Sequence, residues 1–486
     1  MPEKNYLIVD IGTGNSRVAL VSQYGIIHDL ISFENKYYKD LLYDDARYFN
    51  PAEWKTHILD ACKTLLKKHD NLTVAAVSSS GARESIVCYD ENANAFLGLP
   101  NIDNRGRKWM DEITDKAYIY KKTGRWVTED FPAAKIMGVK KMHEDVFARI
   151  KKITSVSEWI AEIFTEKIVI EPSQACETQL YDLDEKQWSE KLCELYKIPE
   201  SILPEIRFAG TSLGTVSEKV QRELGISSNA EFIIGGADTQ IAAKAAGICA
   251  DDVCIVSGTT SPIIRMTAEK YHDEKERCWT NANLGGETYI VETNPGVTGN
   301  NYQRFKNMMF PELSYEKLDE LMSEKKQFLC TASFSSLAFS QKRSLKKGGF
   351  VSRAPFDAHL DKIDLCYAVL ADIACSICEQ YRNLCEIIPH KKDYILGCGG
   401  GFRSELLRQM ISGLTGQKLI FNKGFEQAAV LGCVALCNEY FGMENTHDKN
   451  GGSVFDPADF NTEMIRRYYE AWKTNRDQLN PSDCVN

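Results

Sequence analysis

A carboxylate followed by small residues stands near the start of the chain, in the stretch DIGTGNSR. Apolar residues 6–9 precede Asp10, and a second apolar stretch follows at 18–21. A hairpin with such a turn offers hydroxyls and open backbone N–H groups, which suit phosphate oxygens. Its carboxylate can hold Mg²⁺ through water, or can simply accept hydrogen bonds from the turn. The candidates are Asp10 for the metal and Gly12, Thr13, Asn15 and Arg17 for phosphate.

The same design recurs near the middle of the chain. Apolar residues 253–256 lead into Ser257-Gly258-Thr259-Thr260, and a second apolar stretch begins at Ile263. A repeat of the hairpin strengthens its interpretation as a phosphate site, with Gly258 and Thr259 as the binding residues. Two facing hairpins suggest a nucleotide held between two similar lobes.

Asp238 follows a buried apolar strand and two glycines in the stretch GGADTQ. A carboxylate at a strand end, beside backbone without side chains, lies where a substrate can approach closely. It could accept the proton of an attacking hydroxyl. The alternative is a helix N-cap, because aspartate caps well and a small-residue helix is expected to follow.

Arg83 and Glu84 come shortly after another buried strand and the serine-rich residues 78–81, which we expect to form a turn. A fixed cation beside a fixed anion suits the neighbouring hydroxyls of a polyol, whereas a solvated surface pair is the alternative. Asp103, in the stretch NIDNR, is expected to line the same pocket.

The stretch GCGGG at residues 397–401 follows an apolar strand and precedes a helix. Glycines there let a base or ribose lie against the backbone, with Gly400 and Gly401 as the contacts, and the helix start faces anionic groups. The stretch does not match G-x-G-x-x-G, so a dinucleotide fold is disfavoured. A plain turn from strand to helix is the alternative.

The elements around these residues predict an α/β protein. We expect an antiparallel meander that includes a strand near 26–28, and an amphipathic helix over 51–68. We also expect a mostly helical region over 109–201 and a long amphipathic helix near 360–384. Strands that lead into glycine-rich turns once per half imply two lobes with a cleft between them.

Bulk properties are typical of a water-soluble enzyme. The chain has 486 residues, 43% of them hydrophobic, and a formal charge of −10. That balance argues against nucleic acid or an anionic membrane as a partner. We find neither a membrane span nor a signal peptide and expect a cytoplasmic protein. The sixteen cysteines and eight histidines lack ligand spacing, so we expect buried thiols and no structural metal.

Six segments occur in an order that resembles the FGGY family of carbohydrate kinases, over residues 6–442. They are DIGTGNSR, SSSGARES, GGADTQIAAKAAG, SGTTSPIIR, LGCGGGFRSELLRQMISGLTG and EQAAVLGCVAL.

The resemblance implies two actin-like ATPase lobes of the ribonuclease H-like type, with an ATP and sugar cleft between them. It also implies transfer of the ATP γ-phosphate to a hydroxyl of a small sugar or polyol, with Mg²⁺. We divide the chain at residues 1–243 and 244–486, and a homodimer is compatible with this interpretation.

The resemblance also implies a role for each matching residue. Asp238 corresponds to the catalytic base and Asp10 to the residue nearest Mg²⁺. Arg83 and Glu84 would contact the sugar hydroxyls. The nucleotide contacts would be Thr13, Arg17, Gly258 and Thr259 for phosphate, and Gly400 and Gly401 for adenosine.

The acceptor stays open at this stage. Xylulokinases carry a Met-His step where this chain has Arg83 and Glu84, which disfavours that activity. Glycerol kinases and autoinducer-2 kinases both carry Arg-Glu, and the stretch that ends in NIDNR looks more like the autoinducer-2 kinase pattern. Outside the kinases, an ATPase of the actin or heat-shock chaperone type, or a sugar sensor without activity, are the alternatives.

Overall fold

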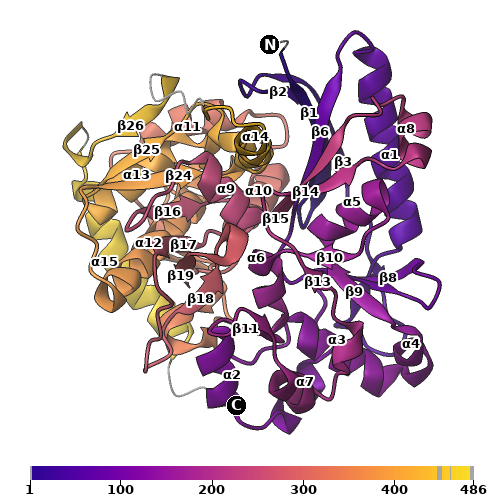
Figure 1. The fold of residues 1–486 in the computed structure, drawn as a ribbon. Helices are drawn as coiled ribbons and strands as arrows, with labels where there is room; N and C mark the ends of the chain where they lie inside the picture. Colours follow the sequence, from indigo (N-terminus) through magenta and orange to yellow (C-terminus); the bar gives the residue numbers. More distant parts are fainter. Residues whose placement is uncertain (1–2, 446–450, 460, 482–486) are drawn as a thin grey trace.

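The computed structural model describes residues 3–445, 451–459 and 461–481. Each half of the chain builds one large sheet, and the ribbon shows two lobes side by side (Figure 1). No helix among the described residues is both long and apolar enough to cross a membrane.

The first sheet, as far as the described residues show it, has the order β14-β15-β6-β1-β2-β3. Strands β1, β2 and β3 form the expected antiparallel meander, while β6 and β15 run parallel to β1. The bounds are β1 Asn5–Ile11, β2 Asn15–Ser22, β3 Ile27–Glu34, β6 Val74–Gly81, β14 Ser212–Thr215 and β15 Glu231–Ala237.

The serine run before Arg83 is not the turn that the sequence suggested. Residues 78–81 continue β6 and are buried, paired with β1 on one side and β15 on the other. Serine has a weak intrinsic preference for strands, so the neighbouring strands decide its conformation. The chain therefore leaves the sheet only at Ala82, directly beside the first hairpin.

Helices cover one face of the first sheet. Helix α1 spans Pro51–Lys68, as predicted, and begins at Asn50, whose side chain accepts the N–H of Ala52. Its apolar face packs with α5 (Val156–Thr165) and α8 (Glu218–Leu224) over the sheet core.

Apart from α5, which packs on the first sheet, the region between β6 and β14 forms an insert at the lower end of the first lobe (Figure 1). It is helical for much of its length, as expected, but short strands interrupt it. Its helices are α2 Lys116–Thr123, α3 Pro132–Met142, α4 Glu144–Arg149, α6 Pro172–Ala175 and α7 Glu190–Tyr196. Its strands are β7 Ile86–Tyr89, β8 Ala95–Leu99, β9 Lys152–Ser155, β10 Val169–Ile170, β11 Tyr181–Asp182, β12 Gln187–Trp188 and β13 Glu205–Ile206.

The second sheet has the order β18-β19-β17-β16-β24-β25-β26 within the described part of the chain. Strands β16 and β17 are the second hairpin, and β24 and β25 run parallel to β16 and to each other. The bounds are β16 Val253–Val256, β17 Ile263–Thr267, β18 Trp279–Ala282, β19 Tyr289–Thr293, β24 Tyr394–Cys398, β25 Lys418–Phe421 and β26 Ser453–Phe455.

The long helix α12 (Lys362–Ile387) lies in the core of the second lobe, starting from a capping box at Asp361 and Asp364. The remaining helices are α10 Gly299–Met309, α11 Tyr315–Ser323, α13 Glu405–Thr415 and α15 Glu463–Leu479, and the remaining longer strands are β20 Cys330–Ser333 and β23 Gly349–Ser352.

Two helices join the lobes. Helix α9 (Asp238–Ala245) leaves β15 and packs on the second sheet, whereas α14 (Ala428–Tyr440) returns from the second sheet and packs on the first. The Tyr6 hydroxyl donates to Asn438 Oδ1 at 2.8 Å across this junction. The division at residues 243 and 244 stays a prediction, and it falls inside α9.

Candidate active site

The backbone of the first hairpin turn is fixed by hydrogen bonds, and its outer side is open to solvent. The N–H of Gly12 donates to the carbonyl of Asn15 at 3.1 Å, and Asn35 Nδ2 donates to the carbonyl of Gly12 at 2.7 Å. Gly14 and Asn15 are exposed, and a Cβ placed on Gly14 would meet nothing within 4 Å. The turn therefore has a fixed backbone and free space on its outer side.

Asp10 lies at the base of this hairpin, between Arg17 on β2 and Ser80 on β6. Only 7% of the residue is exposed, and Arg17 Nη1 is 3.9 Å from its Oδ2. Burial raises the pKa of Asp10, and the Arg17 charge opposes that rise. A nearly buried carboxylate under an open turn fits a metal ion that keeps most of its own water.

The second hairpin turn is built in a similar way. The N–H of Gly258 donates to the carbonyl of Thr260 at 2.8 Å, and Gly258 and Thr259 are exposed. Beneath them, Ser257 Oγ and Ser261 Oγ share a hydrogen bond of 2.9 Å. Exposed backbone on a braced turn is the arrangement that phosphate oxygens require.

The glycine-rich loop after β24 packs directly against this hairpin. The N–H of Gly401 donates to the carbonyl of Ser257 at 2.8 Å, and a Cβ on Gly401 would lie 2.3 Å from Ser257 Oγ. Glycine is therefore required at 401 by close packing. Gly400 beside it is exposed, so the loop and the hairpin form one continuous backbone surface.

Asp238 is the first residue of α9 and keeps part of its side chain exposed. Ala237 occupies the N-cap position, while Asp238 Oδ1 accepts the N–H of Thr239 at 2.7 Å. At Gly235, just before, a Cβ would lie 1.6 Å from the carbonyl oxygen of Ser79. That close approach of β15 to β6 fixes where the carboxylate emerges.

The charges around Asp238 come from the other candidate residues. Burial raises the pKa of Asp238 to about 7, with Arg83 lowering it and Asp10 and Glu84 raising it further. Candidate residues from two other motifs thus act electrostatically on Asp238. A carboxylate with such a pKa can take a proton near neutral pH.

Arg83 is not a surface residue. It is 7% exposed and forms a two-point ion pair with Glu292 on β19, at 2.5 and 3.0 Å. Glu84 is partly exposed, adopts a left-handed φ of 58°, and lies 3.8 Å from Arg125 Nη1. The Arg-Glu step therefore lies at the interface between the lobes, and the surface-pair alternative is wrong.

Asp103 lies deeper than the other candidates. It is fully buried, and its two carboxylate oxygens accept from the backbone N–H of Arg47 at 2.8 Å and from Arg105 Nε at 2.6 Å. Asn101 is the residue of this segment that reaches the first hairpin, where its Nδ2 donates to Thr13 Oγ1 at 2.8 Å.

Sequence reasoning missed Glu292, Arg125 and Glu177. Each is an isolated charge in an otherwise ordinary segment. Arg125 pairs with Glu177 within the first half of the chain, whereas Glu292 pairs with Arg83 across the two halves. The apolar residues just before Glu292 indicate a buried strand, but this pattern does not identify a partner for its carboxylate.

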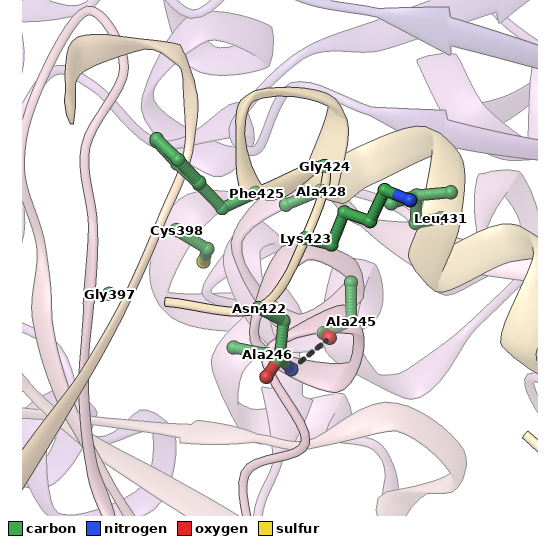
Figure 2. A pocket seen from close by; sticks show the side chains of 10 residues that line it. All are labelled: Ala245, Ala246, Gly397, Cys398, Asn422, Lys423, Gly424, Phe425, Ala428 and Leu431. Atoms are coloured by element: carbon green, nitrogen blue, oxygen red, sulfur yellow. Dashed lines mark hydrogen bonds between the residues drawn. The ribbon is translucent and has the colours of Figure 1, made fainter. Parts of the chain in front are cut away.

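At the junction of the lobes, the loop after β25 lines a small pocket with the end of α9 (Figure 2). Asn422 Nδ2 donates to the carbonyl of Ala245 at 3.1 Å there. Farther along, Gln427 Oε1 accepts from Arg17 Nη1 of the first hairpin at 3.3 Å. Arg17 is thus shared between Asp10 in one lobe and Gln427 in the other.

Two lobes joined by crossing helices, with a glycine-rich hairpin in each, define the two-domain actin-like, ribonuclease H-like class. Comparison with known proteins identifies the family within that class. The profile of the FGGY family of carbohydrate kinases, N-terminal domain, matches residues 5–244.

YoaC of Bacillus subtilis (strain 168), whose assignment as a sugar kinase is itself provisional, is 39% identical over 97% of this chain and 96% of its own. The chain belongs to the FGGY family of carbohydrate kinases and is an ATP-using phosphotransferase with an alcohol group as acceptor.

Other relatives differ in substrate. A xylulose kinase of Lactococcus lactis subsp. lactis is 25% identical over 82% of both chains. A solved structure of Plasmodium falciparum glycerol kinase with ADP superimposes with a TM-score of 0.83 over 98% of both chains, at 17% identity. These likenesses leave the acceptor of this chain open.

Proposed function

We propose that this enzyme transfers the γ-phosphate of Mg·ATP to a hydroxyl of an open-chain polyol or ketose, with Asp238 as the base. The single observation that carries the proposal is that the partly exposed carboxylate of Asp238 lies within the electrostatic influence of Arg83, Glu84 and Asp10. Phosphoryl transfer is accelerated mainly by positioning and charge neutralisation, which this arrangement favours.

Asp238 accepts the proton of the attacking hydroxyl, because its carboxylate is partly exposed and its pKa lies near neutrality. Arg83 and Glu84 hold the neighbouring hydroxyls. Asp103 is engaged with Arg105 and Arg47, so we give it the role of a positioning residue behind the pocket.

The two hairpin turns bind the phosphates, through Gly12, Thr13, Asn15 and Arg17 in one lobe and Gly258 and Thr259 in the other. Gly400 and Gly401 lie against the adenosine. Asp10 would hold a magnesium ion through its bound water, and the ion would supply positive charge to neutralise the phosphates. Arg17 contacts Asp10 in one lobe and Gln427 in the other. It therefore links the two lobes, and it helps to exclude water from the site when they close.

The acceptor types that fit this pocket are those of autoinducer-2 kinases, glycerol kinases and xylulokinases. The Arg83-Glu84 step favours the first two. We place the enzyme in the cytoplasm, because ATP is supplied there, and include a homodimer in the proposal.

A screen of ADP release tests the proposal. Glycerol, xylulose, ribulose, erythritol and the open-chain autoinducer-2 precursor are the acceptors, each with Mg·ATP. We expect at least one acceptor to stimulate ADP release strongly above the rate without sugar. ATP turnover that ignores every acceptor would instead indicate an actin-like or chaperone-like ATPase.

Replacement of the base gives the sharper test. We expect Asp238→Asn to lower sugar-dependent ADP release by about 10² to 10⁴-fold, since the amide cannot take the proton. ATP binding and the unfolding midpoint serve as controls for an intact fold. Turnover near the wild-type rate in a folded variant would contradict the role of Asp238.

A further inference from the structure

Glu292 is a buried carboxylate of the second lobe that the proposed reaction does not use. It lies near the end of β19, and none of its side chain is exposed. Its Oε2 and Oε1 accept from Nη1 and Nη2 of Arg83 at 2.5 and 3.0 Å. A two-point pair fixes the plane of a guanidinium as well as its position. Arg83 belongs to the first lobe, so the group that orients it comes from the opposite half of the chain.

The second sheet holds the Glu292 carboxylate in turn. Asn281 on the neighbouring strand β18 donates from Nδ2 to Oε2 at 3.2 Å, and Asn294 donates from Nδ2 to Oε1 at 3.1 Å. Asn294 is itself held, because its Oδ1 accepts the N–H of Gly296 at 2.9 Å. Together with the contacts to Arg83, each carboxylate oxygen accepts two hydrogen bonds, which is its usual capacity. Glu292 is therefore fully hydrogen-bonded within the protein, and its role is to hold Arg83.

A second carboxylate near Arg83 is the weaker partner. Glu177 Oε1 lies 3.7 Å from Arg83 Nη1, beyond hydrogen-bond distance, and it accepts from Arg125 instead. Burial raises the pKa of Glu177 well above its usual range, although Arg125 and Arg83 act to lower it. Burial acts on Glu292 too, but the charge and hydrogen bonds of Arg83 outweigh it and lower the pKa of Glu292. Glu292 is thus the ionised partner of Arg83 near neutral pH.

The two residues proposed to hold the acceptor are fixed from different lobes. The backbone of Glu84 is fixed within the first lobe, because buried Lys135 of α3 donates from Nζ to the Glu84 carbonyl at 2.6 Å and to the Pro100 carbonyl at 2.8 Å. The Arg83 side chain is instead fixed from the second lobe by Glu292. The spacing between the Arg83 guanidinium and the Glu84 carboxylate therefore depends on how the lobes pack.

We propose that Glu292 is a positioning residue for acceptor binding, which orients Arg83 and through it sets the affinity for the sugar or polyol. This inference rests on the proposed kinase function, in which Arg83 holds acceptor hydroxyls. The two hairpin turns proposed for the phosphates contain neither residue. Loss of Glu292 is therefore expected to weaken the binding of the acceptor and to spare that of ATP.

The first arm of the test replaces Glu292 with glutamine, which keeps the volume but removes the charge and one acceptor oxygen. ADP release is measured with the best acceptor of the screen. We expect the acceptor KM to rise by about 10- to 100-fold, the scale of a hydrogen bond to a charged group. The KM for ATP should stay within about twofold and kcat within about threefold, the pattern of lost acceptor binding.

Two failures of this arm are distinguishable. An unchanged acceptor KM in folded Glu292→Gln overturns the inference but leaves the kinase function standing. A wild-type enzyme that shows no acceptor-dependent ADP release with any compound overturns the proposed function itself.

The second arm tests whether Glu292 acts through Arg83. Arg83→Gln, Glu292→Gln and the double variant form a double-mutant cycle, in which residues that act as one unit are not additive. In the Arg83→Gln background, Glu292→Gln should change the acceptor KM by less than about threefold, because the side chain that it positions is already gone. An equal rise in both backgrounds overturns the inference, since Glu292 would then act without Arg83.

A similar pair elsewhere supplies the matched control. Arg476 of α15, on the outer side of the second lobe, forms a two-point pair with Glu379 (Figure 1). Glu379→Gln removes the same charge from the same kind of pair, and it should leave both KM values unchanged.

Glu292→Asp is the second variant at the site, for use if Glu292→Gln does not fold. It keeps the charge but is one methylene shorter, so it cannot reach both nitrogens of Arg83 in the present geometry. We expect its acceptor KM to rise by about tenfold. An unchanged acceptor KM in whichever variant folds overturns the inference.

Discussion

Asp238 is not the helix N-cap that the sequence offered as an alternative, because Ala237 occupies that position. It lies in the first turn of α9 and accepts the N–H of Thr239, yet part of its carboxylate stays exposed to the site. Hydrogen bonds from the backbone N–H and the hydroxyl of Thr239 to Oδ1 orient the carboxylate and leave Oδ2 to take a proton.

The pKa of Asp238 predicts how activity depends on pH. A base must be ionised to work, so we expect kcat/KM for the sugar to fall as pH drops through about 7, the value to which burial raises this pKa. Arg83 opposes the rise, while Asp10 and Glu84 add to it. A profile of kcat/KM between pH 5 and 9, at saturating Mg·ATP, measures this fall, which is the acidic limb of the profile.

The variant Glu84→Gln provides the comparison for that profile. Loss of its negative charge should move the acidic limb to lower pH, since Glu84 raises the pKa of Asp238. A flat profile across neutrality would contradict the assignment of Asp238 as the titrating base.

Some site residues could be predicted from sequence and others could not, for a physical reason. Asp10, Asp238 and the hairpin glycines sit in short segments whose local pattern already defines strand, turn and carboxylate. Glu292 acquires its role only when folding brings it to Arg83, 209 positions away in the chain. Such a pair forms only when the two lobes pack against each other in one particular arrangement, and no local sequence pattern encodes that arrangement.

At the scale of elements, prediction succeeded where one face of a helix or strand is buried. The bounds of α1 and the pairing of both hairpins follow from apolar spacing. Ser78, Ser79 and Ser80 with Gly81 show the limit of this approach, since they look like a turn and yet lie in the central part of a sheet. Neighbouring strands supply hydrogen bonds that outweigh the local preference.

The glycines of these elements differ in whether they tolerate substitution by alanine. We expect Gly235→Ala to lower the unfolding midpoint sharply and to abolish activity, because its Cβ would lie 1.6 Å from the Ser79 carbonyl. Gly258→Ala should keep the wild-type midpoint, since a Cβ there meets nothing within 4 Å. It should raise the KM for ATP, because the methyl enters the space proposed for phosphate.

Thermal unfolding and ATP titration of the two variants measure this contrast. An unchanged midpoint for Gly235→Ala would show that β15 and β6 can separate at little cost. An unchanged KM for ATP in Gly258→Ala would place the phosphates away from the second hairpin.

At the scale of the whole molecule, the lobes depend on each other for their cores. Helix α14 comes from the second half of the chain but contributes Val430, Cys433 and Leu436 to the core on the first sheet. The two halves therefore should not unfold separately, although the sequence division into 1–243 and 244–486 suggests two units.

We expect one cooperative unfolding transition in urea, with coincident curves from tryptophan fluorescence and circular dichroism. Tyr6→Phe should lower the free energy of unfolding by about 1 to 3 kcal/mol, because Asn438 Oδ1 loses its buried donor. Tyr24→Phe is the control, since Tyr24 is 56% exposed. Two separate transitions would contradict the dependence of one lobe on the other.

The position of α14 also has a consequence for synthesis of the chain. The ribosome completes β15 about 190 residues before it begins the helix that covers that sheet face. At ordinary translation speeds the nascent first lobe carries a bare apolar surface for roughly ten to forty seconds. That interval is when a chaperone that recognises exposed hydrophobic surface would engage the growing polypeptide.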